Sequence, residues 1–158
     1  MKLKKWKVYG FWIGLSEMVG LLSGLLSWGG AEVYAQTVTK PPLSPPGIVF
    51  PIVWTVLYAL MGVGAAMMWL AENSDLRKRG LNLFVTQLVV NFFWSLIFFN
   101  LQAFRLAFIW LLVLLALVIW MTYVFYKVDP LAGLLQLPYI IWLLLAAYLS
   151  AGVWILNG

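Results

Sequence analysis

The sequence predicts an all-α membrane protein, a bundle of five transmembrane helices with a long loop between the first helix and the second. Hydrophobic residues make up 65% of the 158 residues and charged residues only 9%, whereas soluble domains contain about 25% charged residues. The apolar residues also gather into runs near the ~20 residues that cross a bilayer as a helix. These runs are apolar on every face and lack the two-residue alternation of barrel strands, so a helical bundle is expected.

Five such runs divide the chain, which we interpret as one transmembrane domain over residues 1–158. The predicted spans are 9–28, 48–70, 81–101, 106–126 and 131–156. Most connections between them are short, so consecutive spans should be antiparallel neighbours. The lysine-rich start and the small residues near Ala35 imitate a cleavable signal peptide. The length of the first apolar stretch and the presence of Glu17 favour a retained span instead.

The connection over residues 29–47 is the longest and the most polar. It contains four prolines and several glycines, which do not continue a helix, so an irregular loop is predicted. At its end, Ser44 is predicted to cap the second helix with Pro45 in the first helical position.

Three further local features concern the helix ends. Asp129 followed by Pro130 predicts the start of the fifth helix by the same capping arrangement. The charged residues 72–79 predict a turn between the second and third spans. Pro138 predicts a bend in the fifth span, because its ring removes one backbone hydrogen bond.

Basic residues are distributed unevenly between the two sides of the predicted bundle. Eight lie on the side of the N-terminus and two on the other: Lys2, Lys4, Lys5, Lys7, Arg77, Lys78, Arg79 and Lys127 against Lys40 and Arg105. For an inner-type membrane, where the positive-inside rule applies, this predicts a cytoplasmic N-terminus, with the long loop and the C-terminus on the opposite side. We interpret the net charge of +5 as this topology signal and expect no nucleic-acid partner.

The sequence lacks the residues that most catalytic and metal sites require. It has no cysteine and no histidine, which excludes a thiolate nucleophile, a histidine base and imidazole metal ligands. Glu17 is the only acidic residue inside a predicted span, where a charge is costly. We therefore predict no catalytic residues, no metal site and no required cofactor.

The third span carries a polar stripe on one face. Gln87, Asn91 and Ser95 recur every four residues, with Trp94 and Phe98 beside them. Such a stripe should face the bundle interior. It is explained equally by hydrogen bonds between helices and by a polar patch within an aromatic ligand pocket.

Two other spans place aromatic and small residues on one face. They are Trp54, Tyr58 and Met61 in the second span, and Pro138, Trp142, Ala146, Ser150 and Trp154 in the fifth. Trp54, Trp94 and Trp142 lie deeper than a membrane-interface belt requires. Core packing and stacking on a flat ligand explain these three equally well. In the first span, Gly10, Gly14, Gly20 and Gly24 form two small-xxx-small pairs, which permit close helix packing inside a protomer or between two.

These motifs resemble those of the TspO, or translocator protein, family, which includes the peripheral benzodiazepine receptor and the tryptophan-rich sensory proteins. The resemblance rests on KPPLSPPG at 40–47 leading to Trp54, on the 91–94 segment, and on PYIIWLLLAAYLS at 138–150. It implies a five-helix bundle, commonly dimeric, with a pocket beneath the first loop. That pocket binds porphyrins and, in some members, sterols or benzodiazepine-like drugs.

Carried over by position, the resemblance implies seven ligand-binding residues: Tyr34, Pro45, Trp54, Asn91, Trp94, Trp142 and Ala146. Pro45 and the loop would form the lid. The sequence departs from the family pattern in this lid, where Ala35 and Leu43 replace residues that are usually aromatic, so different lid contacts are expected. Lys40 or another loop cation is expected to meet the propionates of a porphyrin.

The resemblance leads to a hypothesis about function. We expect an integral membrane protein that binds porphyrin, as a homodimer surrounded by lipid and in some contexts sterol, and acts in tetrapyrrole homeostasis, transport or stress sensing. One alternative is an enzyme that degrades porphyrin with light and oxygen. Another is a facilitative carrier of small hydrophobic ligands.

Overall fold

The computed structural model describes residues 2–157, with side chains from residue 5 onward, and these residues form helices and turns without a strand. The helices are α1 (Lys2–Leu26), α2 (Trp28–Thr37), α3 (Val49–Leu70), α4 (Asp75–Ser95), the π-helical η1 (Leu96–Asn100), α5 (Phe104–Val128), α6 (Pro130–Leu134) and α7 (Leu137–Asn157). Five stretches are long and apolar enough to cross a membrane: Lys5–Leu26, Val49–Leu70, Asp75–Asn100, Phe104–Val128 and Pro130–Asn157. The predicted class is confirmed.

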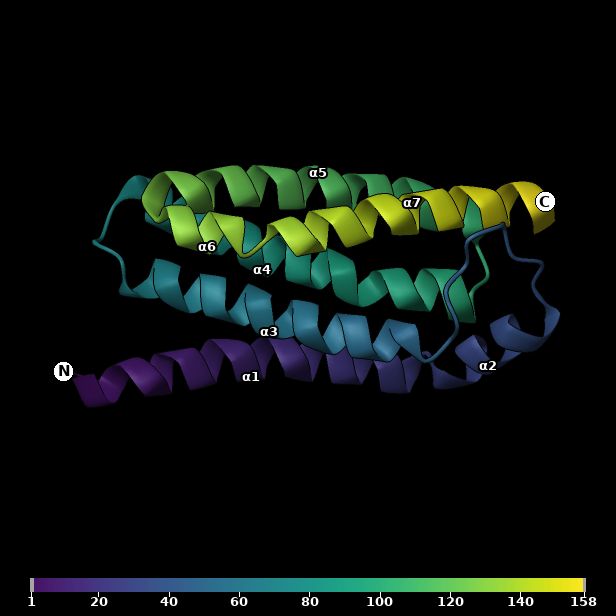
Figure 1. Ribbon diagram of the computed structural model, residues 1–158, viewed down its shortest axis with the longest axis horizontal. Coiled ribbons are helices and arrows are strands. Elements are labelled where there is room, and N and C mark those ends of the chain that lie inside the picture. The colour runs from purple at the N-terminus through teal and green to yellow at the C-terminus, as the bar shows by residue number, and fades with distance from the viewer. Residues whose placement is uncertain (1, 158) are drawn as a thin grey trace.

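The long helices lie side by side along the long axis of the molecule (Figure 1). Helix α1 packs along α3, α4 packs on α5, and α5 packs on α7. The N-terminus shares one end of the bundle with the α3–α4 and α5–α6 connections, whereas α2, the long loop and the C-terminus occupy the other end. Only 17% of the first span is buried, against 33–39% of the others, so α1 is the outermost helix.

The core of the bundle contains mainly methionine, aliphatic and phenylalanine side chains. Its fully buried members include Met61, Ala65, Met68, Phe84, Val118, Met121 and Phe125. Gly62 allows α1 to approach α3 closely, because a Cβ there would collide with the backbone of Ile13. The loop end has a smaller buried cluster, with aromatic rings around Phe98.

The prediction that residues 29–47 form an irregular loop is wrong for the first half of that segment. Helix α2 passes through Gly29 and Gly30 and continues to Thr37. Gly30 fits against the backbone of Phe99, where a Cβ would collide, so this glycine serves a close contact and does not end the helix. The Lys40 ammonium caps the C-terminal end of α2, donating to the carbonyls of Tyr34, Ala35 and Val38 at 3.1–3.3 Å.

The predicted cap of the second span is also wrong. The Ser44 hydroxyl donates to the Pro41 carbonyl at 2.8 Å, which closes a turn within the loop, and α3 begins only at Val49. The corresponding prediction at Asp129 is confirmed, because its carboxylate accepts a hydrogen bond from the Leu131 N–H at 3.1 Å, with Pro130 in the first turn.

The charged turn predicted over 72–79 is too long. Ser74 caps α4 by accepting from the Arg77 N–H at 3.1 Å, so the helix already begins at Asp75. In the fifth span, the predicted bend takes the form of a break between α6 and α7 at residues 135–136, just before Pro138. Pro138 has no N–H to bond to the preceding turn.

Candidate ligand-binding site

A chain of buried hydrogen bonds joins three helices at the centre of the bundle. The Tyr58 hydroxyl on α3 donates to Asn91 Oδ1 on α4. Asn91 Nδ2 donates to the Tyr139 hydroxyl of α7 at 2.7 Å, and that hydroxyl donates to Gln87 Oε1 at 2.7 Å. Gln87 Nε2 in turn lies 3.7 Å from the Met61 sulfur. The polar stripe of the third span therefore does bond neighbouring helices.

Aromatic rings cover this chain toward the loop end. Trp54 lies 5.5 Å from the Tyr58 ring and 6.1 Å from the Tyr139 ring, measured between centroids. It also meets Trp142 edge to face, at 6.4 Å and 87°. Phe50, one turn before Trp54, also meets Trp142, with 5.6 Å between the ring centroids. The two deep tryptophans of α3 and α7 thus form one aromatic cluster above the Tyr58–Asn91 hydrogen bond.

Trp94 belongs to a second aromatic group. Its ring stacks on Phe98 at 4.9 Å and 22°, and Phe98 and Phe99 each lie 5.2 Å from the Tyr34 ring of α2. The Lys40 ammonium lies 4.8 Å from the centroid of the Tyr34 ring. Burial beside the apolar group raises the pKa of the Tyr34 phenol.

The proline-rich loop is attached to α7 at several points. Asn157 bonds both the N–H and the carbonyl of Thr39, at 3.0 and 2.8 Å. The Tyr148 hydroxyl donates to the Pro42 carbonyl at 2.7 Å. Pro45 is half-buried in this loop, whereas Leu43 is 84% exposed at φ 69°. Tyr148 and Asn157 hold the loop over the aromatic end of the bundle.

Three buried polar atoms have no hydrogen-bond partner among the described residues. They are the Trp94 indole nitrogen, the Ser150 hydroxyl oxygen and Gln136 Oε1. An unpaired buried donor costs about 1–3 kcal/mol, so groups of this kind usually require an explanation such as a binding role. Ser150 lies one turn after Ala146 on α7, so the two residues share a face of the helix. Ala146 is 8% exposed.

The structure therefore brings Trp54, Asn91 and Trp142 together, and places Tyr34 and Trp94 in the adjoining aromatic group. Ala146 lies in the core, packed with the residues of the same cluster. Tyr139 is the central residue that the sequence analysis missed. Its position three residues before Trp142, on the same face of the helix, was the available signal. Lys40, for which a contact with the propionates of a porphyrin is expected, caps α2 in this structure.

Fold and site together define a class, a multi-pass helical membrane protein. Its interior is lined by aromatic rings, hydroxyl groups and amides, beneath a loop that is bonded to α7. The model of the TspO/MBR family matches residues 12–155. The chain therefore belongs to the TspO/MBR family.

The relatives include bacterial and animal proteins. The chain is similar to Protein CrtK of Rhodobacter capsulatus, with 42% identity over 125 residues that cover 77% of each chain. It is 32% identical to Tryptophan-rich protein TspO of Chlorobaculum tepidum over 149 residues, 92% of each chain. It is 34% identical to the human Translocator protein over 127 residues, 79% of this chain and 75% of that one.

Proposed function

We propose that the protein binds a porphyrin, or a similarly flat apolar molecule, against the cluster of Trp54 and Trp142 and acts in tetrapyrrole homeostasis, transport or stress sensing. The observation that supports this most is the edge-to-face contact of these two rings above a fully hydrogen-bonded polar chain. The rings present a large apolar surface, and burial of such surface contributes about 25 cal/mol per Å² before the cost of ordering the loop is subtracted.

The polar groups of the site suit a mostly apolar ligand with a few polar atoms. Tyr58, Asn91 and Tyr139 satisfy one another, so they form a rigid floor. The Trp94 N–H and the Ser150 hydroxyl have no partner among residues 5–157 and are available to orient a ligand. Since the Lys40 ammonium already binds three carbonyls at the C-terminal end of α2, the propionates of a porphyrin would have to displace it or meet another group.

Binding is tested by tryptophan quenching in detergent, with protoporphyrin as the titrant. Trp142→Ala should weaken binding by about 2 kcal/mol, roughly thirtyfold, as for a central aromatic contact. The matched control is Trp6→Ala, because Trp6 is 64% exposed at the far end of α1. Equal affinity of the two variants, or no quenching of the unaltered protein, would contradict the proposed function.

A light-dependent degradation of porphyrin is a second candidate function, since two oxidisable indoles meet at the proposed site. Illumination of the porphyrin complex in air should then yield a product that free porphyrin does not give. Loss of that product in Trp54→Phe with binding retained would support an enzyme. If free porphyrin gave the same product, an enzymatic function would be refuted. The remaining functions would be ligand binding, or passage of the ligand as a carrier.

The glycines of α1 suit an interface with a second copy of the chain. Gly10, Gly14 and Gly24 have no neighbour within 4 Å of a Cβ built on them, so the outer face of α1 can accept a second copy of the chain closely. We expect a homodimer, which crosslinking at a cysteine introduced at Gly14 would detect.

The N-terminus is expected in the cytoplasm, and labelling of a cysteine at Lys5 from one side of the membrane tests this.

A further inference from the structure

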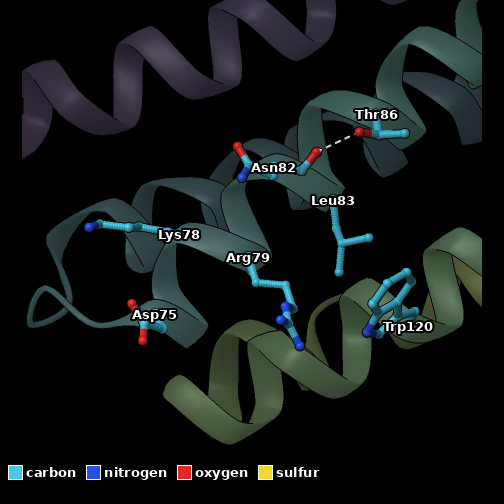
Figure 2. A pocket seen from close by; sticks show the side chains of 7 residues that line it. All are labelled: Asp75, Lys78, Arg79, Asn82, Leu83, Thr86 and Trp120. Atoms are coloured by element: carbon cyan, nitrogen blue, oxygen red, sulfur yellow. Dashed lines mark hydrogen bonds between the residues drawn. The ribbon is translucent and has the colours of Figure 1, made fainter.

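A hollow of about 460 Å³ lies between α4 and α5 toward the N-terminal end of the bundle, and it shares no lining residue with the aromatic site. Its lining residues are Asp75, Lys78, Arg79, Asn82, Leu83, Thr86 and Trp120. Figure 2 shows Arg79 and Leu83 extending from α4 toward α5, which carries Trp120. Two cations and one carboxylate line it, which leaves a formal charge of +1.

The two cations of the hollow differ from their neighbour Arg77, which has a structural role. Arg77 donates to the carbonyls of Met68 and Trp69 at 2.8–3.2 Å and lies 4.9 Å over the Trp69 ring, so it closes the end of α3. Within the described part of the chain, Lys78 and Arg79 make no side-chain hydrogen bond or ion pair. Their charges are available to an anion.

The depth of the lining residues matches a phospholipid. Arg79 lies four residues inside α4, about 6 Å from its start, and Trp120 lies eight residues before the end of α5, about 12 Å from it. A basic residue above an indole is the usual arrangement where headgroups meet the hydrocarbon. The Asn82 side chain lies between these levels, about 10 Å into α4, and offers polar groups at the depth of the glycerol esters. Thr86 lies one turn deeper, where its hydroxyl donates to the Asn82 carbonyl at 2.8 Å.

An apolar path continues from the hollow toward the middle of the bundle. Val89 follows Thr86 by three residues on α4, and Val113 precedes Trp120 by seven on α5, so each shares a face with its lining residue. Both valines are 51% exposed. Acyl chains can therefore lie along the seam between the two helices, while the phosphate stays beside Arg79.

We propose that this hollow is a binding site for one anionic glycerophospholipid, with the phosphate held by Arg79, the charge of Lys78 at the edge of the hollow, and the acyl chains along the α4–α5 seam. Arg79 binds the phosphate through its planar fork of N–H donors. A headgroup with hydroxyls, such as phosphatidylglycerol, also gives the Asp75 carboxylate a donor. The proposal is independent of the porphyrin site.

Native mass spectrometry of the full chain in a neutral detergent counts bound lipids directly. Phosphatidylglycerol should bind as one tight equivalent and phosphatidylcholine more weakly. Arg79→Gln should weaken phosphatidylglycerol binding about tenfold, the equivalent of one charge-assisted hydrogen bond. Arg79→Lys should restore part of the loss. Lys78→Gln serves as the second variant if Arg79→Gln does not fold by circular dichroism.

The matched control is Lys127→Gln, which removes the same charge at the same end of the bundle. Lys127 lies outside the hollow, 5.4 Å over the Tyr123 ring, so its loss should leave lipid binding within about twofold if the site is specific and not a general surface attraction. Equal losses in Lys127→Gln and Arg79→Gln would overturn the proposal. So would equal affinity for phosphatidylcholine, or inorganic phosphate that binds as tightly as the lipid.

Discussion

Removing the Tyr139 hydroxyl should destabilise the bundle about twice as much as removing the Tyr58 hydroxyl. Tyr139 stands in the middle of the buried chain, where its hydroxyl accepts from Asn91 Nδ2 and donates to Gln87 Oε1, both at 2.7 Å. Tyr58 makes a single hydrogen bond, to Asn91 Oδ1. Tyr→Phe keeps the ring at each position, so the packing contribution is nearly the same in both variants.

The magnitude follows from the number of hydrogen bonds lost. Hydrogen bonds between membrane helices contribute about 0.6 kcal/mol on average and at most about 1.7. Tyr58→Phe leaves one acceptor unpaired and should cost about 0.6–1.7 kcal/mol. Tyr139→Phe leaves a donor and an acceptor unpaired, because neither amide has another partner for those atoms among the described residues. Its expected cost is about 1.2–3.4 kcal/mol.

Titration with sodium dodecyl sulfate in mixed micelles, followed by circular dichroism, measures the free energies of unfolding. Tyr126→Phe is the control, because Tyr126 is 49% exposed and its hydroxyl makes no hydrogen bond within residues 5–157. It should change stability by less than about 0.5 kcal/mol, as for other surface positions. Equal losses of unfolding free energy in Tyr58→Phe and Tyr139→Phe would refute the idea that these hydrogen bonds link α4 to α7.

Three further substitutions test local features of the fold. Gly62→Ala should destabilise the α1–α3 contact by about 1–3 kcal/mol through overpacking, as measured in the same titration. Gly14→Ala is the control and should be neutral or stabilising, because the space around Gly14 is open. Lys40→Met should speed hydrogen exchange in the last turn of α2, because three carbonyls lose their donor; unchanged exchange there would argue against the cap. Asp129→Ala should cost about 1 kcal/mol as a lost N-cap, and Asp129→Ser should recover most of it.

The site was partly predictable because helical periodicity is a local property. Gln87 and Asn91 are one turn apart, so their shared face could be read from spacing alone. The periodicity did not distinguish a ligand contact from a bond between helices. Which partner each amide meets depends on the rotation of α3 and α7 about their axes, and that rotation brings Tyr58 and Tyr139 to the amides.

The loop was predicted less well because its residues act through distant contacts. Glycine and proline preferences describe an isolated chain, and they indicated no helix at Gly29 and Gly30. In the fold, Gly30 lies against the backbone of Phe99 and Lys40 caps the following turns, so tertiary packing overrides the weak local preference. Ser44 failed as a cap for a similar reason, since its hydroxyl is used by the Pro41 carbonyl.

By itself, the sequence determined that this protein crosses a membrane five times as helices, because a bilayer without water requires long apolar segments whose backbone bonds are internal. It also determined which faces carry polar and aromatic side chains. Only the tertiary structure decided that Trp54 meets Trp142 over the Tyr58–Asn91 bond, and that the hollow beside Arg79 lies apart from them. Lipid surrounds every helix alike, so hydrophobicity places the spans in the membrane, and close packing and hydrogen bonds between helices decide which faces meet.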